Sequence, residues 1–592
     1  MSVKRIFDLL DFYKKEFPNK EVMYAGKVAG NWEKWSFAKC EQLMTDLASG
    51  FANLGIERGE RVMLMSNNRP EWNIIDFACQ LSGIILVPVY PNISENDLQF
   101  IINDCEARVL IYSSPDLADK ASAVQKGAKQ QVHLYSIEPV TGVDHWMSLV
   151  ERGVGNTAEE RIAAVKHETK TNDLVTLLYT SGTTGTPKGV MLSHENLVSN
   201  FSALKDLPPI DGNSIVLSFL PLNHIYERML TYLYVMKGSS IYYAESLEKI
   251  GENIKEVKPH MFSCVPRLLE KVYDKIITKA SELSPIKKAL FFWALGLGER
   301  YDVRGDHRSG WYNFQLRIAR KLIFSKWQEA LGGNVRAMVS GGAALNPRLA
   351  RIFWAADIPV LEGYGLTETS PVIAVNTLTP GHTRFGTVGP VISNVKVKIA
   401  EDGEILMKGP SLMLGYYKRQ DATDEVIDKD GWFHTGDIGH MEEGKYLKIT
   451  DRKKEIFKTS GGKYIAPQMI ENALNSSRFI EQSMVVGENQ KFPGAVVVPS
   501  FAFVREWAER HEIALSSSDA EVVKHPKVVE RIMEEVDVIN KDLAQYERIK
   551  QIILRPALFT IEGGHLTPKL SLKRKFILAE HAADIEKMYA GE

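Results

Sequence analysis

Short apolar runs alternate with amphipathic segments between Arg61 and Ser113, and this alternation restricts the fold more than any other feature. The runs RVMLMS, IILVPVYP and ARVLIYSS predict strands, because they are short and apolar. The segment that opens at Pro70 predicts a helix, as does the one that opens with Ser94 and Asp97 in the spacing of a capping box. Strands that alternate with helices form parallel sheets with helices on their faces, so the sequence predicts an α/β fold.

A strand followed by a glycine-containing loop recurs at three places further along the chain. The three segments are LVTLLYTSGTTG, VRAMVSGGAAL and IPVLEGYGLTET. Open parallel sheets bind ligands at the loops beyond the carboxyl ends of their strands. Because a sheet brings its strand ends together, we expect these loops to be three walls of one site.

The length of 592 residues exceeds what one hydrophobic core usually serves, so we expect two or more domains. After Gly386 the sequence changes to short alternating strands and turns, which predicts a β-rich subdomain. Charged residues follow the strand YLKIT at Asp451, and the sequence there has no long Gly/Ser-rich or Pro-rich linker. We therefore predict an N-terminal domain over residues 1–450, a short hinge at Asp451, and a second domain over residues 451–592.

Charge, cysteine spacing and hydropathy argue against several classes of protein. The formal net charge of -2 and the pI near 6.7 give no overall attraction to nucleic acid, so we expect no such partner. The four cysteines are scattered without a metal-binding spacing, which favours free thiols in a reducing compartment. The sequence predicts neither a signal peptide nor the run of about 20 apolar residues that spans a bilayer. We expect a cytoplasmic protein.

The segment from Lys287 to Trp327 contains many aromatic and basic residues and few acidic ones. Basic, aromatic, amphipathic helices lie on membrane surfaces in some proteins, which suggests peripheral attachment to the inner face of the membrane. Ordinary helices that pack on the core and expose their lysines and arginines to water are the interpretation that we favour for this segment.

The segment YTSGTTGTPKG, from Tyr179 to Gly189, is the strongest chemical signal. Glycines allow close backbone approach to phosphate, hydroxyls and amides donate hydrogen bonds, and a lysine supplies positive charge. The loop is not a Walker A sequence, because Lys188 precedes a glycine instead of Ser or Thr. The predicted triphosphate-binding residues are Thr180, Ser181, Gly182, Thr183, Thr184, Gly185 and Lys188.

These eleven consecutive residues resemble the signature loop of the adenylate-forming superfamily, which includes acyl-CoA synthetases, luciferases and peptide-synthetase adenylation domains. The segments SGGAAL and GYGLTET resemble its adenine-binding stretches, which implies nucleotide contacts from Gly342, Ala343, Tyr364 and Gly365. The resemblance also implies that Thr367 faces the α-phosphate and that Glu368 binds Mg²⁺ as a catalytic and metal-associated residue.

Two later segments extend the resemblance towards the C-terminus. WFHTGD ends in Asp437, which the family pattern places at the ribose hydroxyls. DRKKEIF supplies Asp451 as the hinge and Arg452 as a second ribose contact. The implied fold is a large N-terminal α/β domain with parallel-type sheets flanked by helices and a β-rich subdomain, followed by a small, mobile α+β C-terminal domain.

Within the superfamily, PLNHIYER and GGKYIAPQMIE most resemble bacterial long-chain acyl-CoA synthetases (AMP-forming). This implies that His224 borders the site of the substrate carboxylate and that Gly461 and Gly462 contact coenzyme A. The expected reaction joins a long-chain fatty acid to coenzyme A through an acyl-adenylate, at the expense of ATP. The resemblance specifies neither the acyl chain length nor the oligomeric state.

The C-terminal segment LTPKLSLKRK resembles the motif with the family's adenylation lysine but departs from it at one position. Ser571 stands where lysine is usual, and Lys569 and Lys573 lie two residues to either side. A shift of two residues keeps a side chain on the same face of an extended segment, so either lysine could act, and we favour Lys569. The alternatives are an aryl-acid ligase, an enzyme that acylates a carrier protein, and a weakened homologue that binds nucleotide.

Overall fold

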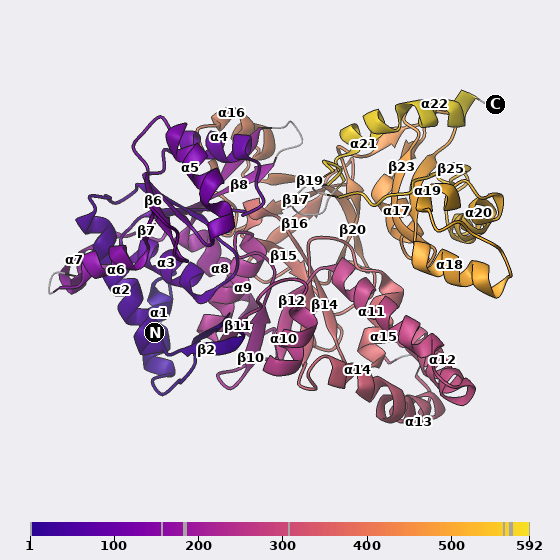
Figure 1. Ribbon diagram of the computed structural model, residues 1–592, viewed down its shortest axis with the longest axis horizontal. Coiled ribbons are helices and arrows are strands. Elements are labelled where there is room, and N and C mark those ends of the chain that lie inside the picture. Colours follow the sequence, from indigo (N-terminus) through magenta and orange to yellow (C-terminus); the bar gives the residue numbers. More distant parts are fainter. Residues whose placement is uncertain are drawn as a thin grey trace. The chain divides into compact units, whose positions relative to one another are not determined.

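The computed structural model describes residues 3–155, 158–181, 186–305, 308–560, 563–566 and 572–590 (Figure 1). It divides into two compact units. The first unit contains residues 1–397, 407–433 and 443–447, and the second contains residues 398–406, 434–442 and 448–592. The predicted boundary at Asp451 lies close to the last of these divisions and remains a prediction.

Two eight-stranded sheets form the centre of the first unit. In spatial order, one sheet contains β15 (Val372–Val375), β14 (Val360–Gly365), β13 (Ala337–Ser340), β12 (Met261–Cys264), β10 (Ile215–Ser218), β11 (Ser240–Tyr243), β1 (Tyr24–Val28) and β2 (Asn31–Trp35). The other contains β18 (Gly415–Tyr416), β9 (Pro187–Ser193), β8 (Leu174–Ser181), β4 (Ile85–Val89), β3 (Arg61–Met65), β5 (Val109–Tyr112), β6 (His133–Ser136) and β7 (Asp144–His145).

Most neighbouring strands in both sheets are parallel, as the strand and helix alternation predicts. Antiparallel pairs lie at the edges, where β14 pairs with β15, β1 with β2, and β9 with both β8 and β18. The structure confirms the helix that begins at Pro70 and the cap at Ser94, whose hydroxyl accepts a hydrogen bond from the Asp97 amide at 3.1 Å.

Helices surround and separate the two sheets (Figure 1). Those of the first unit are α1 (Asp8–Glu16), α2 (Phe37–Asn53), α3 (Pro70–Leu81), α4 (Glu95–Cys105), α5 (Ala118–Lys126), α6 (Met147–Gly153), α7 (Ala158–Glu168), α8 (His194–Leu204), α9 (Ile225–Met236), α10 (Ile250–Val257), α11 (Pro266–Ser281), α12 (Pro285–Glu299), α13 (Gly310–Ala319), α14 (Ser325–Ala330), α15 (Pro347–Ala355) and α16 (Gln420–Val426). Short turns are η1 (Pro115–Leu117), the π-helical η2 (Arg320–Phe324) and η3 (Thr367–Thr369).

Helix α9 connects the two sheets through adjacent residues. Glu227 accepts a hydrogen bond from Ser263 of β12, in one sheet. Arg228 donates to Thr176 of β8, in the other sheet, at 2.8 Å. Arg228 also forms a fully buried ion pair with Asp76 of α3 at 2.6 Å. A buried charge needs such partners, so this pair fixes α9 beside α3 between the sheets.

The β-rich section after Gly386 is a four-stranded sheet of β16 (Lys396–Ile399), β17 (Glu404–Lys408), β19 (Phe433–Glu442) and β20 (Tyr446–Arg452). The remainder of the second unit holds the hairpin of β21 (Phe457–Lys458) and β22 (Tyr464–Ile465), and a sheet of β23 (Ile480–Val486), β24 (Gly494–Pro499) and β25 (Gln551–Leu554). Its helices are α17 (Pro467–Leu474), α18 (Phe501–Arg510), α19 (Asp519–Val522), α20 (Pro526–Asn540), α21 (Arg574–Glu580) and α22 (Ala582–Ala590).

Candidate functional site

The glycine and hydroxyl-rich loop connects two antiparallel strands, β8 and β9. Thr180 and Lys188 are register partners in this hairpin, so they frame the connection. Gly182, Thr183, Thr184 and Gly185 lie outside the described residues, and Ser181 is described only as the last residue of β8.

Lys188 and Glu368 both contact Tyr416, a residue that the sequence does not mark as functional. The Lys188 ammonium nitrogen lies 5.1 Å from the centre of the Tyr416 ring. The Tyr416 hydroxyl donates a hydrogen bond to Glu368 Oε1 at 2.9 Å. Burial, together with the nearby Glu368 carboxylate, raises the pKa of Tyr416 above its ordinary value, so the hydroxyl remains a donor. The structure thus brings the end of the hairpin together with the GYGLTET segment.

The expectation that one sheet supplies all three loops is wrong. The YTSGTTGTPKG loop belongs to the sheet of β8 and β9, whereas SGGAAL and GYGLTET follow β13 and β14 in the other sheet. Strand β18 pairs with β9 and carries Tyr416, and this pairing brings the loops together across the two sheets. Parallel strand periodicity does not distinguish one sheet from two, so the sequence pattern contained no signal for this arrangement.

The SGGAAL loop closely approaches helix α9. A Cβ atom on Gly341 would lie 3.3 Å from the Tyr226 ring, and the Tyr226 hydroxyl donates to the Val339 carbonyl at 3.1 Å. Gly342 has a positive φ of 84° with open space around it, so backbone conformation and not packing requires glycine there. Ala343, next along the loop, is exposed.

Glu362 of β14 holds the far end of the same loop and was also missed from sequence. Its Oε1 accepts a hydrogen bond from the Leu345 amide at 3.3 Å. Burial raises the pKa of this carboxyl to about 8. The raised pKa favours the protonated form near pH 7, and the side chain connects two of the predicted nucleotide-binding segments.

The GYGLTET segment turns sharply after β14. Tyr364 is half-buried, Gly365 is exposed, and Thr367 is buried at the start of η3. Asn200 of α8 supports this turn, because its amide donates to the Val372 carbonyl at 2.8 Å.

His224 caps the N-terminus of α9, where its Nδ1 accepts a hydrogen bond from the Tyr226 amide at 3.1 Å. With Nδ1 as the acceptor, the neutral ring carries its proton on Nε2. The residue is half-buried, and Tyr226 connects it to the SGGAAL loop through the contacts described above.

The two predicted ribose contacts meet within the second unit. Asp437 is buried on β19, and Arg452 Nε lies 3.3 Å from its Oδ1. The turn before Asp437 is fixed by Glu404, which accepts from the Gly436 amide at 2.9 Å and pairs with Lys453 at 2.9 Å. Burial opposes ionisation of Glu404, but hydrogen bonds from Lys453 and His434 prevail and lower its pKa.

Asp451 is the second-last residue of β20. Its carboxylate accepts hydrogen bonds from the Arg452 amide at 2.5 Å and the Gln468 amide at 3.1 Å. Burial raises the pKa of Asp451 to about 7. This side chain therefore connects the end of β20 to the start of α17.

Gly461 and Gly462 lie in the turn between β21 and β22. Gly462 has a φ of 74° and nothing within 4 Å of a Cβ position, so its surroundings would leave space for a ligand. Glu471, on the helix that follows this turn, is buried and belongs to an ion cluster that the sequence analysis did not identify.

Of the two candidate lysines, Lys569 lies outside the described residues, as does Ser571. Lys573 precedes α21, and its amide donates to the His565 carbonyl at 2.7 Å. The next residue, Arg574, donates to both carboxylate oxygens of Glu471 at 2.7 and 2.6 Å and to Glu455 at 3.0 Å. This buried cluster fixes the start of α21, at the C-terminal end of the lysine motif.

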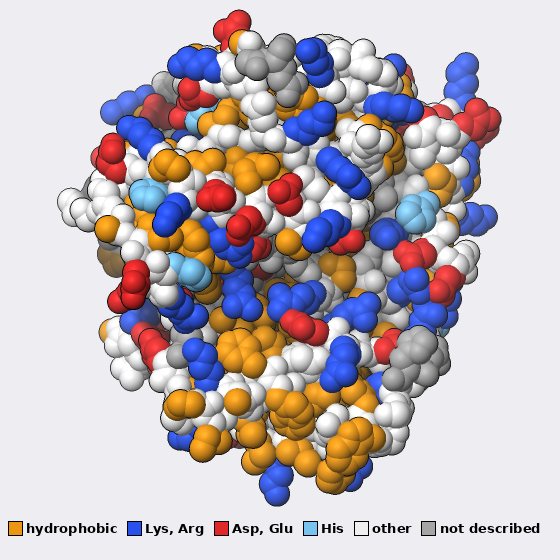
Figure 2. Space-filling model, turned by 90° about the vertical axis from the view of Figure 1, so that its right-hand side faces the viewer, with side chains coloured by type: hydrophobic (Ala, Val, Ile, Leu, Met, Phe, Trp, Pro, Cys, Tyr) orange, Lys and Arg blue, Asp and Glu red, His pale blue; other side chains and the backbone are white. Residues whose placement is uncertain are grey.

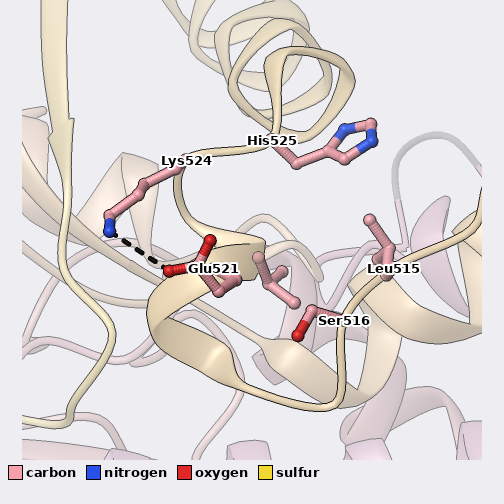
Figure 3. A pocket seen from close by; sticks show the side chains of 6 residues that line it. Leu515, Ser516, Glu521, Lys524 and His525 are labelled. Atoms are coloured by element: carbon pink, nitrogen blue, oxygen red, sulfur yellow. Dashed lines mark hydrogen bonds and ion pairs between the residues drawn. The ribbon is translucent and has the colours of Figure 1, made fainter.

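A pocket of about 280 Å³ in the second unit contains none of the predicted site residues. Lys524 and Glu521, which pair at 3.2 Å, line this pocket together with Ser516 and His525 (Figure 3). Among the described residues, no group of three His, Cys, Asp or Glu side chains could hold a metal ion.

Comparison with known proteins identifies the family. The model of the AMP-binding enzyme family matches residues 11–417, and that of the AMP-binding enzyme C-terminal domain matches residues 454–592. The long-chain-fatty-acid–CoA ligase FadD15 of Mycobacterium bovis is 32% identical, over 96% of this chain and 95% of its own. Long-chain-fatty-acid–CoA ligase 5 of Mus musculus is 35% identical, over 89% of this chain and 80% of its own.

Among solved structures, the adenylation domain of a carboxylate reductase from Mycobacterium chelonae superposes with a TM-score of 0.76. It is 22% identical, with 99% of this chain and 91% of that chain covered, so this likeness shows the fold. The two domain models cover most of the sequence, and the curated relatives match along nearly its full length. The chain therefore belongs to the AMP-binding enzyme family.

Proposed function

We propose that the chain is a long-chain fatty-acid–CoA ligase that forms an acyl-adenylate from a fatty acid and ATP, and then transfers the acyl group to coenzyme A. The contact between Lys188, Tyr416 and Glu368 carries the proposal, because it joins a phosphate-binding type of loop to an acidic residue suited to a metal. Similarity to curated long-chain-fatty-acid–CoA ligases supports the choice of substrate.

The first unit supplies the groups for the nucleotide. Thr180 and Lys188 bind the phosphates from the two ends of the β8–β9 hairpin, together with the loop between them. The adenine lies against Tyr364, Gly342 and Ala343, and Thr367 faces the α-phosphate. In the second unit, Asp437 accepts hydrogen bonds from the ribose hydroxyls, and Arg452 beside it contributes a second contact.

Glu368 fits a magnesium ion. Mg²⁺ is commonly held by one or two carboxylates together with substrate phosphates and water, which agrees with a single acidic side chain at this place. Tyr416 uses one oxygen of Glu368, and a carboxylate accepts several partners at once. Bound there with ATP, the ion would neutralise phosphate charge.

The first step brings an anionic carboxylate to the anionic triphosphate of ATP, so neutralising charge lowers its barrier. A carboxylate oxygen of the fatty acid attacks the α-phosphorus, the bond to the bridging oxygen breaks, and pyrophosphate leaves. Lysine charge and loop amides stabilise the negative charge that builds up. His224, at the N-terminus of α9, orients the incoming carboxylate with its Nε2 proton and the positive end of the helix dipole.

In the second step the coenzyme A thiol loses its proton to water, and its sulfur attacks the acyl carbon. The bond from that carbon to the phosphate oxygen breaks, and AMP leaves. Gly461 and Gly462 leave room for the pantetheine arm, because neither carries a side chain and the space around Gly462 is open. The hinge at Asp451 lets the second domain present different groups in the two steps.

Ser571 favours a second candidate, a homologue that binds nucleotide but forms adenylate weakly. Alanine substitutions of Lys569 and Lys573, made separately, distinguish the two candidates. In a competent ligase one substitution abolishes adenylate formation but leaves the use of supplied acyl-adenylate intact. Loss in neither variant would refute the assignment of the adenylation lysine to this pair.

The direct test measures pyrophosphate release with ATP, Mg²⁺ and a panel of acids, with and without coenzyme A. We expect palmitate to give pyrophosphate, AMP and a palmitoyl thioester of coenzyme A. Faster pyrophosphate release with benzoates would favour an aryl-acid ligase. Acyl transfer to a carrier protein but not to coenzyme A would favour an enzyme that acylates a carrier protein. Binding of ATP without release of AMP would establish the weakened homologue.

We propose a cytoplasmic enzyme with peripheral attachment to the inner face of the membrane. All four cysteines are free and buried, as expected in a reducing compartment. Among the helices of the described ranges, none has both the length and the apolar character needed to cross a bilayer.

A further inference from the structure

The outer faces of α12, α13 and η2 expose large apolar side chains that no other part of the first unit covers. These six residues, which we call the α12–α13 surface, are Ile286, Leu290, Trp311, Phe314, Ile318 and Leu322. Ile286 is 81% exposed and Trp311 is 67% exposed. Figure 2 shows hydrophobic side chains gathered at the lower edge of the molecule, where α12 and α13 lie side by side in Figure 1.

The spacing of these residues shows that the exposure follows the helices. Trp311, Phe314, Ile318 and Leu322 recur every three or four residues, which places them on one face of α13 and its continuation η2. The opposite face is buried at Leu316, Ala319 and Phe324. A helix that is apolar on both faces needs a second apolar partner.

The aromatic end of this surface is preorganised. The Trp311 and Phe314 rings stack with their centres 5.6 Å apart and their planes 23° from parallel. Tryptophan is favoured at the boundary between lipid and water, because its ring is apolar and its indole N–H is polar.

Basic residues border the apolar faces. The two helical segments, Pro285–Glu299 and Gly310–Phe324, contain five basic residues and one acidic residue, although the whole chain has a net charge of -2. Lys287, Arg317 and Lys321 are exposed. The acidic residue, Glu299, already pairs with Arg348 of α15.

We propose that the α12–α13 surface docks on an anionic phospholipid bilayer, with Trp311, Phe314 and their apolar neighbours in the interface and the basic side chains against lipid phosphates. Amphipathic helices with this distribution lie in the plane of the interface. A second copy of the chain fits less well, because a twofold interface would bring the same basic groups together. The inference deepens the proposed peripheral location, and it concerns a surface outside the candidate nucleotide site.

The test measures sedimentation of the full chain with large vesicles of phosphatidylcholine, with and without phosphatidylglycerol. We expect binding to the anionic vesicles only, and weaker binding as salt increases. Replacing Trp311 and Phe314 by serine should reduce the partition constant by at least about ten-fold, from the lost apolar area. Replacing Arg317 and Lys321 by glutamine should reduce it by about five-fold for each charge.

Two control variants match these changes elsewhere on the first unit. Val28→Ser with Leu247→Ser removes exposed apolar side chains, and Lys126→Gln with Lys129→Gln removes exposed charges. Both should bind like the unsubstituted protein. Equal binding by the surface variants, or unsubstituted protein that stays in the supernatant, would overturn the proposal. So would a surface variant that changes only the oligomeric state, since that result identifies a second copy as the partner.

Pyrophosphate release without vesicles, measured on the same variants, separates this inference from the proposed function. The surface variants should retain that activity, which also shows that they fold. Vesicle binding without any ligase activity would refute the proposed reaction but not the docking surface. Ligase activity without vesicle binding would refute the docking surface but not the proposed reaction.

Discussion

Replacing Arg574 by methionine is expected to loosen the region between the glycine turn and the lysine motif. Arg574 donates three hydrogen bonds to Glu471 and Glu455, and its side chain is only 18% exposed. Methionine keeps much of the apolar stem but leaves the Glu471 carboxylate, with 6% of its side chain exposed, without its guanidinium partner. Breaking a buried ion pair costs about 3–5 kcal/mol, and we expect about 3 kcal/mol here because Arg574 has some contact with water.

A fall of about 3 kcal/mol in the free energy of local opening increases amide hydrogen exchange by about 100-fold in the affected segments. Mass spectrometry of peptides from α17 and α21 in the full chain measures this change. Arg510→Met is the matched control, because Arg510 of α18 pairs with Glu506 at the surface and the two side chains are 56% and 36% exposed. Such a pair contributes about 0–1 kcal/mol, so its loss should alter exchange by less than about five-fold.

The combined variant Arg574→Met with Glu471→Gln tests the electrostatic cause. Glutamine removes the unpaired charge, so exchange should return part of the way towards that of the unsubstituted protein. Equal exchange in Arg574→Met and Arg510→Met would refute the reasoning, because the cluster would then add no more stability to the second unit than an exposed pair does. No recovery in the combined variant would show that packing, not charge, matters at Arg574.

Three further predictions concern the first unit. Burial raises the pKa of Glu362 to about 8, above its unfolded value, so its stabilising contribution falls by about 1.4 kcal/mol per pH unit as pH rises from about 4.5 to about 8. Glu362→Gln should therefore flatten the dependence of the unfolding free energy on pH over that window, and an unchanged slope in denaturant titrations would contradict this. Tyr416→Phe keeps the ring beside Lys188 but removes the hydrogen bond to Glu368, so the Mg²⁺ concentration for half-maximal pyrophosphate release should rise by about ten-fold. An unchanged Mg²⁺ concentration would show that Tyr416 has no effect on metal binding. Arg228→Met leaves Asp76 buried without its guanidinium partner, although the Tyr232 hydroxyl still donates to it at 2.6 Å, and should destabilise the first unit by about 3–5 kcal/mol in calorimetry. A loss below about 1 kcal/mol would contradict this expectation.

The sequence predicted those parts of the fold and site that depend on local pattern. The strands and helices between Arg61 and Ser113 are where the alternation placed them. Arg452 lies beside Asp437 in the second unit, and the contact of both with a ribose stays a prediction. Periodicity reports which side chains share a face over a few residues, and motifs report which residue types occur together. Both signals are local, so they identify elements and candidate residues well.

The features that the sequence analysis missed depend on contacts between distant segments. Tyr416 carries no chemical motif, and its role follows only from the pairing of β18 with β9. Glu362 reads as part of an apolar strand until its hydrogen bond to the Leu345 amide is known. Arg574 reads as one of several basic residues after the lysine motif, and only the fold shows Glu471, more than a hundred residues earlier, beside it.

Helix α9 couples the two sheets of the first unit, so that they move together. Its neighbouring residues Glu227 and Arg228 bind opposite sheets, so a tilt that relaxes one attachment strains the other. Strands β8 and β9 and the loops after β13 and β14 should therefore keep their mutual spacing throughout a catalytic cycle. Any rearrangement between the two half-reactions should then occur in segments outside the two sheets and α9.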